Sequence, residues 1–112
     1  MAWKSFGEVT VTAAGTPIRA TINMVNPAAD VKAHTVAFQQ VSGNTGKIYI
    51  QDRQTLGAGN IGRVHVLAIP TSNTLPSVSA GIEYAPGGFN LASYWIDAEV
   101  NGEKCLVSTI EA

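Results

Sequence analysis

The residues at positions 57–62 formally match the dinucleotide-binding pattern GxGxxG, in which glycines let a pyrophosphate approach the backbone. Glu83 lies near the spacing of the acid that binds ribose in such enzymes. The pattern works only where it opens a helix whose N-terminal amides hold the phosphates. Here a run rich in β-branched residues follows at positions 63–69, ahead of Pro70. We therefore expect a glycine-rich turn and no nucleotide cofactor.

Two carboxylates, Asp97 and Glu99, alternate along a predicted strand and would lie about 6–7 Å apart on one face of it. Such a pair could serve acid–base catalysis or contribute to a calcium site. Trp95 shares the predicted face, and Lys104 is expected opposite Glu99. We therefore interpret the face as a solvated or interface-facing surface, with Trp95 as a candidate interface residue.

His34, His65 and Cys105 are residue types that bind zinc, but none has the short spacing of a metal knuckle. Cys105 falls on a predicted apolar face, so we expect a buried structural cysteine and no metal site. The serines lack a local nucleophile signature, and with two histidines in the chain no triad is indicated. The candidate nucleophiles among them are Ser42, Ser72 and Ser93. The sequence predicts no enzyme.

The elements that would position these side chains are predicted strands, because short β-branched and aromatic runs alternate with turn signals. Two runs stand between residues 43 and 70 in the pattern of a β-hairpin region. The strands are expected at residues 8–12, 16–22, 34–41, 47–51, 63–69 and 80–85, with loops at 26–33 and 72–79 and with 34–41 and 47–51 paired as a hairpin.

The pair Asn101-Gly102 suits a two-residue type I′ turn, because both positions of that turn need positive φ. Counting outward pairs Ala98 with Cys105 and Glu99 with Lys104. The apolar face of this predicted hairpin holds Ile96, Ala98, Val100, Cys105 and Val107.

About eight short strands without a convincing helix predict an all-β fold, an antiparallel β-sandwich or a jelly-roll-like barrel. At 112 residues the chain is expected to be a single domain, with residues 1–7 a possible N-terminal arm. That segment carries Trp3 and Phe6 but lacks the alternation that would place both in the protein's own sheet. We expect them either to contact a neighbouring subunit, as interface aromatics often do, or to belong to an ordinary strand over the core.

The composition excludes some partners. A net charge of -1 provides no basic field for nucleic acid or a membrane surface. Charged residues make up 13% of the chain, against about 25% in typical domains, which suggests buried subunit contacts. Neither a signal peptide nor an apolar run of about 20 residues is recognised, so we expect a soluble protein that is not exported.

Three phrases resemble small virion structural proteins of tailed bacteriophages. They are Ala14-Gly15-Thr16-Pro17-Ile18-Arg19, then Gly43-Asn44-Thr45-Gly46-Lys47-Ile48-Tyr49-Ile50, then Tyr94-Trp95-Ile96-Asp97-Ala98-Glu99-Val100 with Leu106-Val107-Ser108 after it. Their order matches a "GTP-x-R" strand, an "NTG-x-IY" hairpin and a closing hairpin in that group. The acidic residue or glycine that often follows the middle phrase is here replaced by Gln51-Asp52.

The resemblance implies a capsid decoration or cement protein made in the host cytoplasm and placed on the capsid exterior. It implies that the partners are the major capsid protein and copies of the chain itself, as a homo-oligomer with a trimer favoured. It brings no catalytic residue and no cofactor. A tail or fibre-base component and a carbohydrate-binding β-sandwich that uses Tyr94 and Trp95 remain as alternatives.

Overall fold

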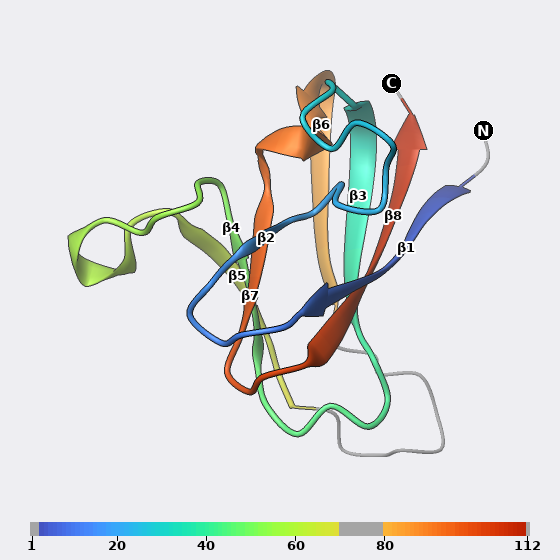
Figure 1. Ribbon diagram of the computed structural model, residues 1–112. Helices are drawn as coiled ribbons and strands as arrows, with labels where there is room; N and C mark the ends of the chain where they lie inside the picture. Colours follow the sequence, from blue (N-terminus) through green and yellow to red (C-terminus); the bar gives the residue numbers. More distant parts are fainter. Residues whose placement is uncertain (1–2, 70–79, 112) are drawn as a thin grey trace.

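The computed structural model describes residues 3–69 and 80–111, and the side chains of all of these except 80–89 and 111. The described residues form two four-stranded antiparallel sheets packed against each other (Figure 1). The first sheet has the order β1-β8-β3-β6 and the second the order β2-β7-β4-β5. The first contains β1 (Trp3–Val11), β8 (Glu103–Glu111), β3 (Lys32–Gln40) and β6 (Ala80–Asn90). The second contains β2 (Ile18–Arg19), β7 (Trp95–Ala98), β4 (Ile48–Gln51) and β5 (Arg63–Leu67).

The all-β sandwich is confirmed. Of the eight strands in the described part of the chain, β2 has only two residues, so about seven are substantial. The core lies between the sheets, because alternate residues of each strand point inward. The first sheet contributes Val9, Val36, Phe38, Cys105 and Val107, and the second contributes Ile48, Ile50, Leu67, Ile96 and Ala98. The antiparallel hairpin of β4 and β5 within residues 43–70 is also confirmed.

The closing hairpin predicted at Asn101-Gly102 is wrong. Strand β7 lies in the second sheet between β2 and β4, whereas β8 lies in the first between β1 and β3. Only Gly102 of the two turn residues has positive φ. The predicted inward residues do face the core, except Val100, which is 39% exposed. Apolar alternation identifies the side that faces the core, but a strand of the opposite sheet shows the same alternation.

The hairpin predicted between residues 34–41 and 47–51 is wrong for the same reason. Strand β3 belongs to the first sheet and β4 to the second, so residues 41–47 cross from one sheet to the other. The second predicted strand, 16–22, is reduced to β2, and residues 20–26 form turns. The last predicted strand, 80–85, extends to Asn90 as β6. The predicted loop at 26–33 runs to Val31, where β3 follows, and the one at 72–79 lies outside the described residues.

The crossing segment is held by a buried polar network. Asn44 Nδ2 donates to Gln40 Oε1 at 2.7 Å and to the Lys104 carbonyl at 2.6 Å. The N–H groups of Thr45 and Gly46 donate to Glu103 Oε1 at 2.7 and 2.6 Å. These bonds replace the strand pairing that the predicted hairpin would have supplied.

Replacing Asn44 by alanine is expected to lower the free energy of unfolding by about 1–3 kcal/mol, because Gln40 and Lys104 lose their buried partner. Urea unfolding followed by circular dichroism measures the change. Asn26→Ala is the matched control, since Asn26 is exposed and should stay within about 0.5 kcal/mol of the unchanged protein. Equal midpoints for the two variants would show that the network does not stabilise the crossing.

Strand β1 begins at Trp3, so the expected start at residue 8 is wrong. Residues 3–7, the described part of the possible N-terminal arm, belong to this strand. A β-bulge at Gly7 explains why the sequence lacks alternation here. Ser5 pairs with Ser108 and Glu8 with Leu106, so two residues oppose Val107, and Gly7 has a φ of 76°. The extra residue turns Phe6 inward, where it is 7% exposed, while Trp3 stays 54% exposed.

Candidate functional site

The outer face of the second sheet gathers the side chains that alternate with the core residues. Ile96 and Ala98 point inward from β7, and Ile48 and Ile50 from β4. The residues between them therefore point outward, and the strand register adds those of β2 and β5. We call this surface the outer face, and it consists of Arg19, Tyr49, Gln51, Arg63, Val66, Trp95 and Asp97.

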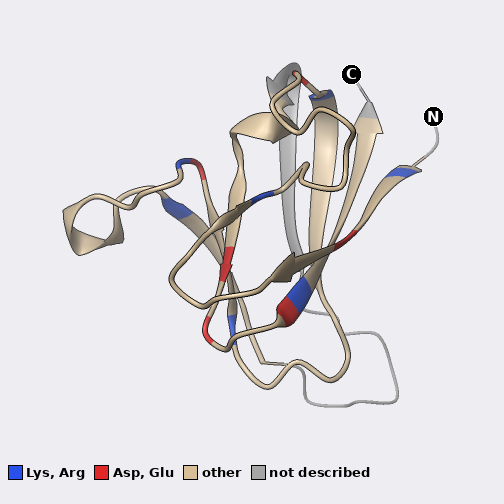
Figure 2. Cartoon of the chain, viewed as in Figure 1, with Lys and Arg blue, Asp and Glu red and all other residues tan. Residues whose placement is uncertain are grey.

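The register arranges the outer face in two rows across the sheet. One row runs through Arg19, Trp95, Gln51 and Arg63, which are successive register partners on β2, β7, β4 and β5. The second row runs through Asp97, Tyr49 and Val66 on β7, β4 and β5. In Figure 2 the edge strands of this sheet, β2 and β5, each carry a blue segment and β7 carries a red one, while most of the described chain is tan.

Two arginines of the outer face lie over aromatic rings. The guanidinium carbon of Arg19 is 4.5 Å from the ring centroid of Trp95, and that of Arg63 is 4.0 Å from the centroid of Tyr49. Each such contact contributes about 0.5–2 kcal/mol, depending on how far it is desolvated. Arg19 also donates to the Ala92 carbonyl. Among the residues whose side chains the structure describes, neither arginine pairs with a carboxylate, so both retain charge that a partner can neutralise.

The three interface candidates from the sequence do not lie together. Trp95 is half-buried on the outer face, and Trp3 is exposed on β1 of the opposite sheet. Phe6 is buried in the chain's own core, which fits the second alternative for this residue, a strand over the core, and does not fit an interface contact. Trp95 alone of the three joins the site. Arg19, Tyr49 and Arg63 were not predicted as site residues from the sequence, although the alternation of Tyr49 between two core isoleucines was a usable signal.

Asp97 and Glu99 are not a solvated carboxylate pair. Asp97 is 9% exposed, and its Oδ1 accepts from the N–H groups of Gly15 at 2.9 Å and Ala98 at 2.8 Å. Glu99 lies beyond the end of β7 and accepts from the Lys47 N–H at 3.2 Å, whereas the Lys104 N–H donates to Asn44. Because β7 and β8 lie in different sheets, Glu99 and Lys104 are not cross-strand partners and their expected pairing is wrong. Asp97 fixes a turn.

The remaining sequence candidates stay apart. Among the described residues no three His, Cys, Asp or Glu side chains gather as a metal site. The GxGxxG stretch forms a loop with one short 3-10 turn, Ala58–Asn60, and strand β5 follows it, as expected for a glycine-rich turn. Ser72 lies outside the described residues. No helix in the described part of the chain is long and apolar enough to cross a bilayer.

Cys105 is buried in the core, as predicted. Burial raises the pKa of its thiol from an ordinary value of 9.0 to about 12. A thiol held protonated in this way is a weak nucleophile.

Cys105 is therefore expected to react with iodoacetamide only as fast as the protein unfolds. Stability should also fall as pH rises from about 9 toward 12, because the unfolded thiol ionises in that range while the folded one stays protonated. Mass spectrometry measures the alkylation, and urea titrations at several pH values measure the slope. In the variant Cys105→Ala, stability should fall less steeply between pH 9 and 12, because the thiol is gone. Rapid alkylation of the folded natural protein at pH 8 would contradict the expected protection of Cys105.

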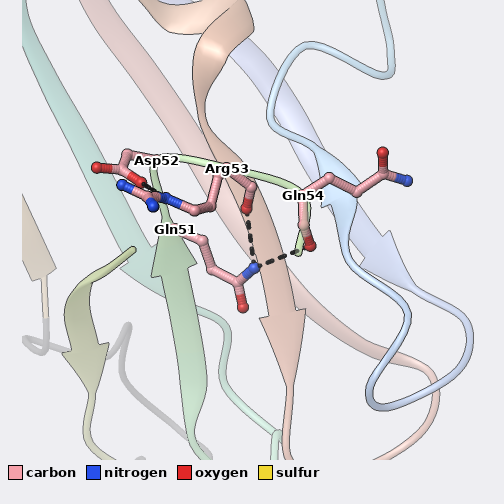
Figure 3. Close-up of polar contacts among 4 residues, drawn as sticks. All are labelled: Gln51, Asp52, Arg53 and Gln54. Carbon is pink, nitrogen blue, oxygen red and sulfur yellow. Dashed lines mark hydrogen bonds and ion pairs between the residues drawn. The ribbon is translucent and has the colours of Figure 1, made fainter. Parts of the chain in front are cut away.

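A pocket of about 310 Å³ opens over part of the outer face, between the turn at residues 15–17 and the loop at 54–56. Gln51 and Asp97 lie at its base, on the adjacent strands β4 and β7. Gln51 Nε2 donates to the carbonyls of Arg53 at 3.0 Å and Gln54 at 3.3 Å, as Figure 3 shows. Asp97 holds the opposite wall through Gly15. Each base residue thus fixes one wall of the pocket.

Comparisons with known proteins identify no relative. No family model matches the chain, and neither a curated protein nor a solved structure is detectably similar to it. The function must therefore be argued from the outer face and the pocket.

Proposed function

We propose that this chain is a structural component of a tailed-phage virion, most specifically a capsid decoration protein that bridges major capsid subunits from the exterior. The observation that carries the proposal is the outer face, together with the phage-like phrases that build it. Those phrases contribute Arg19 to β2, Tyr49 to β4 and Trp95 to β7.

The composition of the outer face supports protein binding. Tryptophan, tyrosine and arginine are the residue types most enriched at interface hot spots. Stacking on the rings holds the two guanidinium groups in place, so less side-chain entropy is lost when a partner binds. A complementary capsid surface would present carboxylates to Arg19 and Arg63 and an apolar patch to Val66, which is 50% exposed.

The fold is suited to a protein that bridges neighbouring subunits. Two packed sheets supply a rigid base, and the β4–β5 connection extends away from it (Figure 1). That connection carries Ile61, which is 60% exposed, and leads into Val64 on β5, which is 39% exposed. Apolar side chains on a projecting loop can enter a gap between neighbouring subunits. The sparse charge of the chain also favours contacts made by shape, including contacts between copies in a homo-oligomer, for which we favour a trimer.

The chain is expected to bind mature capsid shells and not free capsid subunits, because a bridging site exists only where subunits meet. Purified chain is mixed with emptied shells of its own virion and pelleted, and the bound copies are counted by quantitative mass spectrometry. Light scattering of the free chain measures its oligomeric state. Hundreds of copies per shell support the proposal, whereas a chain that stays in the supernatant and copurifies with tails would make it a tail or fibre-base component.

A carbohydrate-binding role is less favoured by the geometry. Arg19 covers one face of the Trp95 ring, which reduces the ring surface that could stack on a sugar. A glycan array tests this alternative, and saturable sugar binding that is lost in Trp95→Ala would replace the capsid proposal.

A further inference from the structure

We infer that the pocket over the outer face binds one basic side chain, lysine or arginine, of the partner protein. The inference rests on the proposed function for the identity of the partner, the major capsid protein. The chemistry of the pocket is argued from Gln51, Asp97 and the two walls.

The base of the pocket offers acceptors that the chain itself does not use. Asp97 Oδ1 accepts hydrogen bonds from the backbone N–H groups of Gly15 and Ala98, and within the described residues Oδ2 has no protein partner. Gln51 Nε2 donates to the carbonyls of Arg53 and Gln54, and Gln51 Oε1 is buried without a donor in the described structure. Figure 3 shows this oxygen pointing away from the carbonyls that hold the amide nitrogen.

These acceptors select the ligand. A group that satisfies a carboxylate oxygen and an amide oxygen must bring N–H or O–H donors, and the carboxylate favours a positive charge. Asp97 is the only charged residue among those that line the pocket in the described structure, so an anion would meet repulsion there. An ammonium or guanidinium group matches both requirements.

The walls select a long side chain. Pro17 on one wall and Leu56 on the other are apolar lining residues that suit the methylene stem of lysine or arginine. The volume of about 310 Å³ is at the lower end for ligand pockets, which matches one side chain better than a folded segment. Both walls are already fixed by Asp97 and Gln51, so the pocket exists before the ligand arrives, and a small shift of the buried Gln51 side chain would bring its Oε1 into contact.

The test uses the ¹⁵N-labelled full chain and Nα-acetyl-lysine N-methylamide as the probe, titrated to about 50 mM, well beyond a millimolar Kd. Amide shifts should saturate at Gly15, Thr16, Gln54 and Thr55. The norleucine analogue, which keeps the stem without the charge, and the glutamate analogue should produce no saturable shift. Equal binding of norleucine, binding of glutamate, or no saturation with lysine and arginine analogues would each overturn the inference.

Two variants sharpen the result. Asp97→Asn keeps Oδ1 for Gly15 and Ala98 and removes the charge, so lysine binding should weaken at least tenfold. Asp30→Asn, at an exposed aspartate far from the pocket lining, is its control and should bind as before. Thr55→Lys on the exposed loop supplies a competing ammonium and should block the probe in a chain whose fold is unchanged. Probe binding unaffected by both Asp97→Asn and Thr55→Lys would contradict the assignment.

The outcomes also separate this inference from the proposed function. If the probe binds but the chain does not bind shells, the pocket stands and the capsid proposal fails. If the chain binds shells with equal affinity when Asp97 is replaced by asparagine, and the probe does not bind, the capsid proposal stands and the pocket assignment fails.

Discussion

Phe6→Ala is expected to lower the free energy of unfolding by about 3–5 kcal/mol, which is the usual range for removing a buried phenylalanine. Phe6 is 7% exposed and packs in the core between the sheets, although the surrounding sequence does not alternate. Guanidinium unfolding monitored by tryptophan fluorescence measures the loss.

Trp3→Ala is the matched control, three residues earlier on the same strand. Trp3 is 54% exposed, so its removal should change stability by no more than about 0.5 kcal/mol. If the two variants were equally stable, Phe6 would not be part of the core and the N-terminal segment would be free to act as an arm. Reduced shell binding by Trp3→Ala without loss of stability would restore part of the original interface expectation.

Arg63→Ala is expected to weaken binding to capsid shells by at least about 30-fold, which corresponds to a hot-spot contribution of about 2 kcal/mol. Its guanidinium lies over the Tyr49 ring, and its Nε is buried without a hydrogen-bond partner in the described structure, which leaves the charge for a partner to neutralise. Surface plasmon resonance on immobilised shells measures the change, and the loss should appear mainly as faster dissociation.

Lys32→Ala removes the same charge from an exposed position of β3, in the opposite sheet, and should bind as the unchanged chain does. Similar losses in both variants would indicate a general charge effect. If Arg63→Ala bound normally while Trp3→Ala did not, the contact surface would lie on the first sheet, and the outer face would have to be abandoned as the interface.

The sequence predicted the side of each strand that faces the core better than the strand that it pairs with. Ile96, Ala98, Cys105 and Val107 all point inward as expected, yet β7 and β8 do not pair with each other. In a sandwich both sheets turn their apolar faces to the same core, so alternation cannot distinguish a neighbour in one sheet from a strand in the other. The Asn101-Gly102 signal favoured the wrong solution, because a turn between sheets uses similar residues.

The candidate site was predictable only in part. Trp95 was predicted from its place on a strand. The burial of Phe6 was not, because the bulge at Gly7 interrupts the alternation of inward and outward residues. The pocket could not be predicted, because its walls are loops that are distant in sequence from each other and are fixed by side-chain bonds from Asp97 and Gln51. Such bonds leave no periodic signal in the sequence.

The order of strands in the first sheet determines when the protein can fold during synthesis. Strand β8 lies between β1 and β3, and Trp3 pairs with Ile110, so the first and last strands that the structure describes are direct neighbours. Neither β1 nor β3 can form its ladder with β8 until β8 has left the ribosome. Such long-range pairing slows folding and leaves apolar strands exposed while translation proceeds. Joining the two ends and opening the chain in the β4–β5 connection would make this pairing local, and the rearranged protein should refold faster than the natural order.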